Sequence, residues 1–392
     1  MEQSKFDDLR IRLKNALPFI LLYFSANALF IYKYGARTSV GSYPGILLYA
    51  VFLAISLPVY LKFLSSWVDK LKDARFAVVY FGMLGLFALS AAALLFKIDP
   101  YSIDVDRWSA IHEFLKNLFA GEFPYLARSH LGNIASPLPV MNFIAIPFYF
   151  MGDVGYLQVF TFALTAVVVF LAPLPKSGKI LFMAAFLLSP AFWYEIAVRS
   201  DMVSNILIIC VCLLFIEKIT GGKPFDHPVK AGCICGALFC TRGVFAIPFA
   251  VFFFARAVSS IKEAGLRKTL IFAACVLMAF ALFLAPFVLW DIELFKQNSP
   301  FLMQTNKSPA IVSAMALAFA ALLSFKVRSA GHSFLRTAVC LFALMGTTMI
   351  IKVFKVGWNT AIFEHKFDVT YYATIIPFIV LGMVYDADEH KY

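Results

Sequence analysis

The sequence predicts an all-α protein built as a polytopic transmembrane helical bundle. Of its 392 residues, 61% are hydrophobic and only 15% are charged, and the mean hydropathy is +0.82. Soluble globular proteins carry about 25% charged residues, so this composition excludes an ordinary soluble fold. Apolar runs long enough to cross about 30 Å of hydrocarbon recur along the whole chain, and we expect about 11 to 12 membrane spans.

The expected spans are the apolar runs between short polar segments. They cover residues 17–35, 43–63, 76–96, 154–173, 179–197, 202–217, 231–255, 269–290, 309–325, 337–351 and 370–385. No small-residue cleavage site follows the first run, so we expect a retained span rather than a signal peptide. The segment from Pro137 to Met151 is short and proline-bounded, which predicts an interfacial or re-entrant piece.

The distribution of Lys and Arg predicts the orientation of the chain. Loops rich in these residues stay cytoplasmic. We therefore expect a cell-membrane protein with both termini on the cytoplasmic side and the polar loop 97–136 on the outer side. The span 231–255 has cytoplasmic charges at both ends. This predicts a turn at Thr241-Arg242-Gly243 between two half-helices, with Arg242 near the outer interface. The net charge of +11 lies in short loops, which favours membrane lipids and an anionic substrate over nucleic acid.

The loop 97–136 is the first place to look for chemistry, because ionisable groups are costly in a membrane protein. Within it, Trp108, Ile111 and Leu115 recur at helical spacing. This pattern predicts an amphipathic helix over 105–121 that lies in the membrane interface, with Trp108 at headgroup depth.

Two aspartates near the start of this helix are candidate catalytic residues. With Ser102 as N-cap, Asp104 and Asp106 lie in or beside the first turn, where the helix dipole favours an ionised carboxylate. An ionised aspartate at the rim of a membrane cavity can act as general base toward an acceptor hydroxyl. The alternative is that both residues only complement the helix N-terminus.

Cations on the outer side are candidates for binding a phosphate. Arg128, Arg199 and Arg242 form this group, since arginine makes bidentate contacts to phosphate. Arg242 is the strongest candidate, because it stands in mid-segment without an acid nearby in the sequence, and an unpaired buried charge is costly. Arg199 could instead extend to lipid headgroups.

A further set of polar and aromatic residues on the outer side is expected to contact substrate. It consists of His130, Glu195, Asp201, Lys307 and Trp358. Structural roles are the alternatives: a hydrogen-bonded loop histidine, a helix cap at Asp201, snorkelling of Lys307 to headgroups and an interfacial aromatic belt at Trp358.

No cofactor is expected. Asp104-Val-Asp106 has a spacing by which two acids can hold a divalent metal, but this spacing is common by chance, so metal use is possible without being favoured. The seven cysteines lie inside apolar spans, which argues against a structural zinc site or disulfides. A P-loop and a GxGxxG motif are absent from the sequence, so a nucleotide-binding module is not expected.

Several motifs together resemble the GT-C superfamily of integral-membrane glycosyltransferases. They are the outer loop with acids near its start, Ser136-Pro-Leu-Pro139, the segment from Ser189-Pro190 to Arg199-Ser-Asp201, and Thr241-Arg242-Gly243 before Pro248. The last segment is similar to one in polyprenol-dependent mannosyltransferases. The resemblance covers roughly 99–248, together with Asp368-Val-Thr-Tyr371 and Pro377. Three expected spans precede the loop where many members have one, so the first two look like an N-terminal addition.

This resemblance implies an inverting hexosyltransferase that works outside the cytoplasm. The donor would be a polyprenyl-phosphate sugar, and the acceptor a hydroxyl of a glycan, lipid or protein. Asp104 or Asp106 would be the base, and Arg242 with Arg128 or Arg199 would hold the donor phosphate. The implied parts are the N-terminal addition (1–75), a GT-C-like core (76–255) and C-terminal helices (256–392) with outer loops 290–309 and 352–369.

Two other functions remain as alternatives, a membrane transporter or lipid flippase and a lipid-linked glycan polymerase or ligase. A transporter typically shows inverted repeats and acids inside its spans. No repeat is visible in this sequence, and its acids, including Glu195 and Asp201, are expected in loops beside the outer interface. A polymerase or ligase typically centres on a large later loop, whereas the larger loop here comes early.

Overall fold

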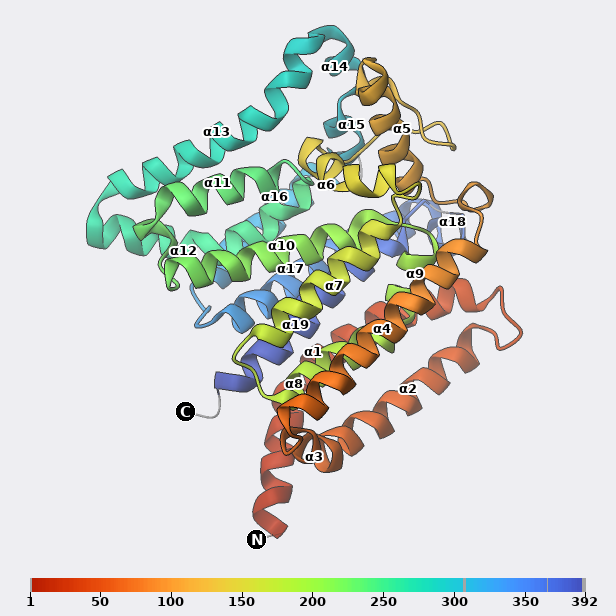
Figure 1. Cartoon of the computed structure of the whole chain (residues 1–392), viewed down its shortest axis with the longest axis vertical. Helices are drawn as coiled ribbons and strands as arrows, with labels where there is room; N and C mark the ends of the chain where they lie inside the picture. Colours follow the sequence, from red (N-terminus) through yellow and green to blue (C-terminus); the bar gives the residue numbers. More distant parts are fainter. Residues whose placement is uncertain (1, 306–307, 365, 390–392) are drawn as a thin grey trace.

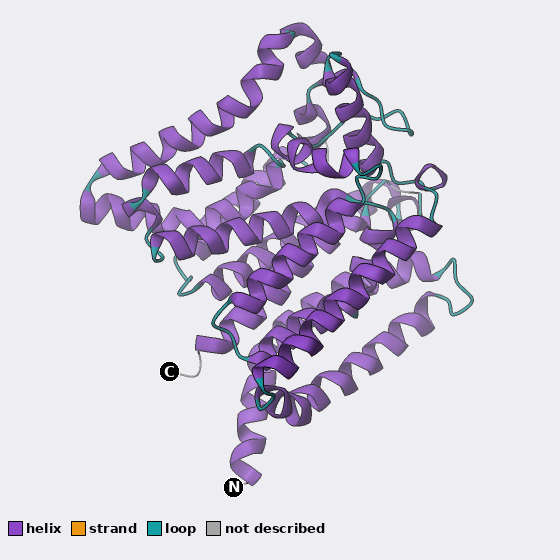
Figure 2. Ribbon diagram, in the orientation of Figure 1, coloured by secondary structure: helices purple, strands orange, loops and turns teal. Residues whose placement is uncertain are grey.

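The computed structural model describes residues 2–305, 308–364 and 366–389. Within these ranges the chain folds into helices and turns and contains no β-strand (Figures 1 and 2). The predicted all-α class is therefore confirmed.

Eight helical segments of the described residues are long and apolar enough to cross a membrane. They are α1 (Glu2–Gly35); α2 (Ser42–Val59) with η1 (Tyr60–Leu64) and α3 (Ser65–Asp69); α4 (Asp73–Lys97); α10 (Asp201–Thr220); η5 (Gly243–Phe245) with α12 (Ala246–Ala264); α13 (Leu266–Trp290); α17 (Ala330–Val356); and η6 (Val369–Thr374) with α19 (Ile375–Glu389). The length and composition of these helices thus indicate a multi-pass membrane protein.

Shorter helices connect these segments. They are α5 (Arg107–Ala120), α6 (Pro139–Phe150), α7 (Tyr156–Leu171), α8 (Lys176–Leu187), α9 (Pro190–Ala197), α11 (Pro228–Phe239), α14 (Ile292–Asn298), α15 (Pro300–Thr305), α16 (Ala310–Ser324) and α18 (Trp358–Ile362), with 3₁₀ turns η2 (Pro100–Ser102), η3 (Pro124–Leu126) and η4 (Pro224–Asp226).

The expected number of 11 to 12 spans is not confirmed, because the described residues contain eight, or up to nine if one bent pair counts as a span. The runs 154–173 and 309–325 form helices of only 16 and 15 residues, α7 and α16. Each is shorter than the roughly 20 residues that cross the hydrocarbon core.

The run 179–197 is bent by 59° between α8 and α9. Proline cannot donate a backbone hydrogen bond, and it disfavours helical backbone in the residue before it, so α8 ends before Pro190. The Ser189 hydroxyl accepts a hydrogen bond from the Phe192 amide and caps the new helix.

The predicted break near Thr241-Arg242-Gly243 is present. The helix α11 ends at Phe239, and the next turn begins at Gly243. The two pieces are unequal, since the second is a full span of 22 residues instead of a half-helix. The carbonyls of Thr241 and Cys240 accept hydrogen bonds of 3.0 Å from the amides of Leu138 and Val140 at the start of α6, so the broken backbone is paired inside the protein.

The helix predicted over 105–121 forms as α5, but its apolar face packs on protein. Trp108, Ile111 and Leu115 are all buried, in a cluster with Met141 of α6 and Phe287 of α13. Trp108 therefore packs against protein instead of lipid, and its depth in the membrane stays a prediction.

Ser102 is not the N-cap of α5. It ends the 3₁₀ turn η2, and its hydroxyl donates to the Asp99 carbonyl, while Asp106 occupies the cap position.

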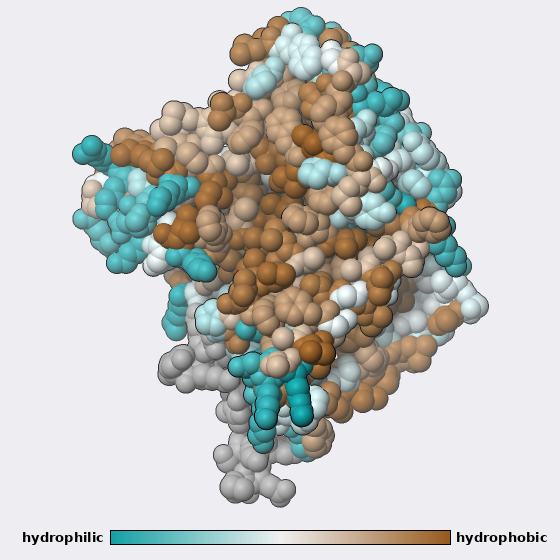
Figure 3. Space-filling model, in the orientation of Figure 1, coloured by the Kyte–Doolittle hydropathy of each residue, from teal (hydrophilic) through white to brown (hydrophobic). Residues whose placement is uncertain are grey.

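The loop 97–136 lies at the opposite end of the bundle from the start of α1 and the end of α19. Figure 1 shows α5, α6, α14 and α15 together at the top, whereas α1 begins at the bottom and α19 ends at the lower left. Hydrophobic residues cover much of the surface between these ends, and hydrophilic residues gather toward the periphery (Figure 3). Two helices at the centre are the most enclosed, α10 and η6–α19, whose span windows are 61% and 78% buried.

Candidate functional site

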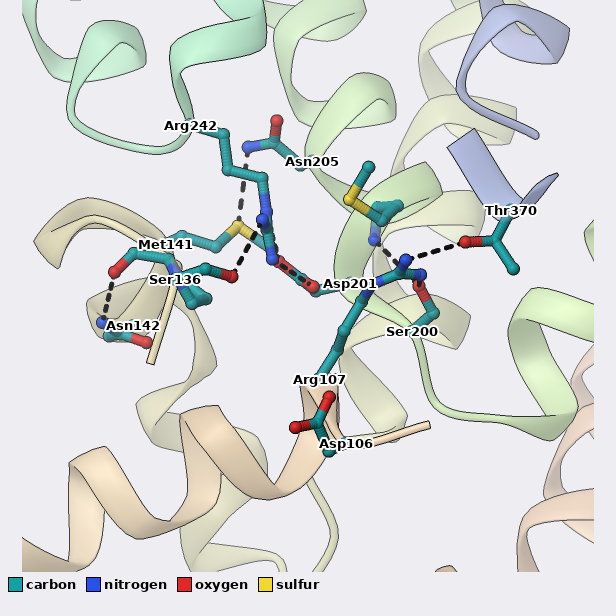
Figure 4. Close-up of polar contacts among 12 residues, drawn as sticks. Asp106, Arg107, Ser136, Met141, Asn142, Ser200, Asp201, Asn205, Arg242 and Thr370 are labelled. Carbon is teal, nitrogen blue, oxygen red and sulfur yellow. Dashed lines mark hydrogen bonds and ion pairs between the residues drawn. The ribbon is translucent and has the colours of Figure 1, made fainter. Parts of the chain in front are cut away.

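The enclosed helix α10 begins at a cluster of buried charges. Ser200 caps the helix, since its hydroxyl accepts from the Met202 amide, and Asp201 is the first helical residue. Each of these neighbours binds a different arginine. Figure 4 shows Arg107 reaching Ser200 from α5, and Arg242 reaching Asp201 from the break before α12. The start of α10 therefore binds two arginines that are distant in the sequence. Arg107 lies 93 positions from Ser200, and Arg242 lies 41 positions from Asp201.

Arg242 and Asp201 form a bidentate buried ion pair. The Arg242 Nε and Nη2 donate to the two Asp201 carboxylate oxygens at 2.8 and 2.6 Å, and the side chains are 10% and 1% exposed. Arg242 Nη1 also donates to the Ser136 hydroxyl at 3.3 Å. No acid lies near Arg242 in the sequence, and its partner Asp201 is 41 residues away along the chain. Three of the five N–H donors of the guanidinium are used by described residues, so two can bind a ligand.

Arg107 is bound by groups at the starts of two distant elements, α10 and η6. Its Nη1 donates to Ser200 at 2.8 Å, and its Nη2 donates to Asp368 at 2.5 Å and to Thr370 at 2.7 Å. Burial alone would lower the pKa of Arg107, but Asp368 and Glu195 raise it above its usual value. The guanidinium is therefore a fixed positive charge at every accessible pH.

Glu195 is the least satisfied charged group of this cluster. It lies inside α9, it is 1% exposed, and neither carboxylate oxygen has a hydrogen-bond partner among the described residues. Its nearest cation is Arg107, at 3.6 Å from Nη1 to Oε1. Among the described residues, the Ser204 hydroxyl and the Asn205 side-chain oxygen, both in the first turns of α10, are also buried without partners. Buried polar groups without partners are costly, so their accumulation makes this cluster a candidate functional site.

Asp106 and Asp104 differ sharply in their surroundings. The Asp106 Oδ2 accepts hydrogen bonds from the Ser129 hydroxyl at 2.5 Å and from the Asn133 side-chain Nδ2 at 2.7 Å. Its Oδ1 receives none from the described residues and is available to a ligand. Asp104 is exposed in the bend before the helix. Figure 4 places the Asp106 carboxylate at the start of α5, beside the Arg107 backbone.

Arg199 is enclosed by protein groups. Its Nε pairs with Asp153 at 2.8 Å, its Nη1 donates to the Ile98 carbonyl at 3.1 Å, and its Nη2 donates to the Leu95 carbonyl. Its φ of +53° is in the left-handed region, where the chain turns from α9 into α10. A Cβ on Gly155 would lie 2.8 Å from the Arg199 side chain, so this close approach requires glycine. These contacts favour a structural role over phosphate binding or snorkelling.

Arg128 also binds protein groups. Its Nη1 donates to the carbonyls of Tyr125, Leu126 and Ala127, and its Nη2 donates to Asn298 at 2.6 Å. It therefore joins the turn η3 to the end of α14, which leaves Arg107 and Arg242 as the better candidates for an anion.

The remaining candidates are distributed as follows. His130 contacts the Ser109 hydroxyl at 2.7 Å and the Ile103 carbonyl at 3.0 Å, so both ring nitrogens are used. Trp358 donates to the Tyr32 hydroxyl at 3.1 Å. Lys307 lies outside the described residues. Glu195 and Asp201 belong to helices, so the expectation that they lie in loops is wrong.

Sequence reasoning missed Arg107, Asp153, Ser200 and Asp368 as members of the polar network. One signal was available for Arg107, since a cation in the first turn of a helix opposes the helix dipole and needs a compensating partner. The partners themselves lie 88 to 263 residues away from it and share no local pattern with it.

Comparison of the chain with family models, curated proteins and solved structures finds no match. The chemistry of the cluster must therefore be argued from its own residues.

Acid is expected to weaken the contact between Arg107 and Asp368 only at low pH. Burial alone would raise the pKa of Asp368, but Arg107 and Thr370 hold this pKa below its usual value. Because the folded-state pKa is the lower one, the stability from this contact is present above about pH 4 and is lost as the pH falls through the folded pKa. Asp368→Asn should lower the Tm of the solubilised protein at neutral pH, and the difference from wild type should shrink in acid. An equal difference at both pH values would contradict this.

Proposed function

We propose that the protein is a membrane glycosyltransferase of GT-C type, which transfers a sugar from a polyprenyl-phosphate donor to an acceptor hydroxyl outside the cytoplasm. The observation that carries the proposal is the pair of arginines, Arg107 and Arg242, bound to consecutive residues at the start of α10. The part of the chain that resembles the superfamily supplies both arginines, Asp106 and the Ser200-Asp201 pair.

In the proposed reaction the acceptor oxygen attacks the anomeric carbon of the donor. A new C–O bond forms as the bond from this carbon to the phosphate oxygen breaks, and inversion follows from attack opposite the leaving group. The acceptor proton passes to Asp106 Oδ1, while Oδ2 stays bound to Ser129 and Asn133. Polyprenyl phosphate leaves with the electron pair of the broken bond.

The arginines contribute through the charge that develops on the leaving phosphate. Fixed cations stabilise such charge strongly in a site that excludes water. Arg107 and Arg242 are each about one-tenth exposed and are held in place by carboxylates, so they need little reorganisation during the reaction. Their remaining N–H donors can bind the phosphate oxygens.

Activity is expected to survive EDTA, because the proposed reaction uses arginines where other transferases use a metal. Among the described residues, no group of at least three His, Cys, Asp or Glu side chains is arranged to hold a metal. Transfer rates should be measured with and without EDTA, and then with added Mg²⁺ or Mn²⁺. Loss of activity in EDTA and recovery with either ion would instead assign a metal to Asp104 and Asp106.

A transporter is the second candidate, and Glu195 is the observation that favours it. Acids buried within helices at membrane depth mark ion or substrate pathways in transporters, and Glu195 is buried inside α9 without a hydrogen bond from the described residues.

Detergent-solubilised protein separates the two functions, because transport needs a sealed membrane and glycosyl transfer does not. Purified protein should be incubated with polyprenyl-phosphate hexoses and candidate acceptor lipids, and free polyprenyl phosphate measured. The glycosyltransferase proposal predicts release that requires the acceptor. Uptake by proteoliposomes without any release in detergent would overturn it.

A further inference from the structure

An apolar groove of about 260 Å³ lies between α2 and the body of the bundle. Its outer wall is formed by α2 and η1, and its inner wall by α1, α8 and α19. Figure 1 shows α2 standing apart at the edge of the molecule, on the side of α1 and α8. All of these elements except α8 belong to long apolar segments that can cross a membrane, so the groove lies among candidate membrane spans.

The face of α2 that lines this groove is incompletely packed. Leu53, Ser56, Leu57 and Tyr60 follow the i, i+3, i+4, i+7 spacing of one helix face, and all of them line the groove. A face directed at the rest of a bundle is normally buried, yet α2 contains no buried residue. The gap removes dispersion contacts from both walls, and a hydrocarbon chain restores them.

The groove is suited to hydrocarbon because its tyrosine hydroxyls are already used. Tyr23 donates to the Ala185 carbonyl at 2.6 Å, and Tyr60 donates to the Ser177 carbonyl at 2.5 Å. Apart from Ser56, the rest of the wall is apolar, including Ala184 and Met383. A ligand with several polar groups at this depth would therefore lose its hydration and find only the Ser56 hydroxyl as a new hydrogen-bond partner.

One end of the groove adjoins a basic cluster. Tyr60 and Leu64 line this end, and it is followed by the connection from α3 to α4 and the start of α8. The basic cluster comprises the charged residues of η1, α3, the connection to α4 and the first turns of α4 and α8. They are six cations, Lys62, Lys70, Lys72, Arg75, Lys176 and Lys179, and two anions, Asp69 and Asp73. Trp67 is 57% exposed in the same region, as expected for an anchor at the membrane interface. This charge complements an anionic headgroup.

We propose that the groove binds an acyl chain of an anionic phospholipid whose headgroup contacts the basic cluster. The site lies at the opposite end of the bundle from α5, and it is independent of the proposed glycosyl transfer (Figure 1). It assigns a role to α2, which encloses the lipid chain against α1, α8 and α19.

Native mass spectrometry of the purified protein tests this with phosphatidylglycerol and phosphatidylcholine that carry the same chains. Wild type should retain phosphatidylglycerol in preference to phosphatidylcholine. Ala184→Phe, which fills the groove, should reduce the retention of both lipids by about tenfold or more, since several methylenes lose their contacts. Lys70→Gln with Lys72→Gln should remove the preference and leave chain binding.

Ala54→Phe is the matched control, because Ala54 lies on the exposed side of the same helix α2 and does not line the groove. It should bind lipid as wild type does. Ser56→Phe fills the groove from the other wall and replaces Ala184→Phe if that variant does not fold. Equal retention by the groove variants and wild type, equal loss in Ala54→Phe, or no lipid preference in wild type would overturn the proposal.

Discussion

Replacing Arg242 by alanine is expected to abolish sugar transfer and to lower the free energy of unfolding by about 3–5 kcal/mol. The substitution leaves the Asp201 carboxylate buried and unpaired, which is more costly than the net gain from forming the pair. It also removes one of the two cations proposed to bind the donor phosphate. Both effects are measurable on purified protein, by thermal unfolding and by release of polyprenyl phosphate.

Arg242→Lys separates these two effects. Lysine keeps the charge beside Asp201, but it cannot make the bidentate contact or offer the same set of donors to phosphate. We expect a Tm much closer to wild type with transfer still reduced at least about tenfold, one lost charge-assisted hydrogen bond being worth about 1.5–3 kcal/mol. Transfer that follows Tm across both variants would mean that Arg242 only supports the fold.

Asp106→Asn is expected to reduce transfer by about 10²- to 10⁴-fold, the usual contribution of a general base. The asparagine side-chain oxygen can still accept from Ser129 and Asn133, so the loop should keep its position. The amide cannot take the acceptor proton. Initial rates at saturating donor and acceptor measure the effect, with Tm as a check on folding.

Asp104→Asn is the matched control for this variant. Asp104 is exposed and precedes the helix, so its amide variant should transfer at close to the wild-type rate. The double variant should behave like Asp106→Asn alone. If Asp104→Asn is the inactive variant and Asp106→Asn is active, the assignment of the base reverses. If the double variant is as fast as wild type, neither aspartate is the base.

The sequence predicted the fold class and most long helices, because apolar length and composition are local properties. It also predicted the break at Thr241-Arg242-Gly243, since charges at both ends of one run are incompatible with a single crossing. It also predicted 11 to 12 spans, a number that is not confirmed, because helix ends depend on tertiary contacts, as at the short helices α7 and α16. The bend at Ser189 follows from Pro190, whereas apolar length alone predicts one continuous span over 179–197.

Prediction of the site was limited by the distance between partners in the sequence. Asp201 and Arg242 were both candidates, but their pairing depends on how α10 meets the break before α12. Arg199 looked like a free cation, because its partner Asp153 and two carbonyls come from other segments. The apolar residues of α5, among them Trp108, recur at the spacing of an amphipathic helix. This spacing cannot distinguish a helix that faces lipid from one that packs against α6 and α13.

We propose that the cluster around Ser200 and Asp201 is the active site of a polyprenyl-phosphate-dependent glycosyltransferase. Mass spectrometry of lipid-linked products tests it most directly, with membranes containing wild type or Asp106→Asn incubated with a panel of polyprenyl-phosphate sugars. We predict a product one hexose heavier than an acceptor in wild-type membranes, together with free polyprenyl phosphate, and neither in the Asp106→Asn membranes. The same products in equal amounts from both membranes, or none from wild type with any donor, would contradict the claim.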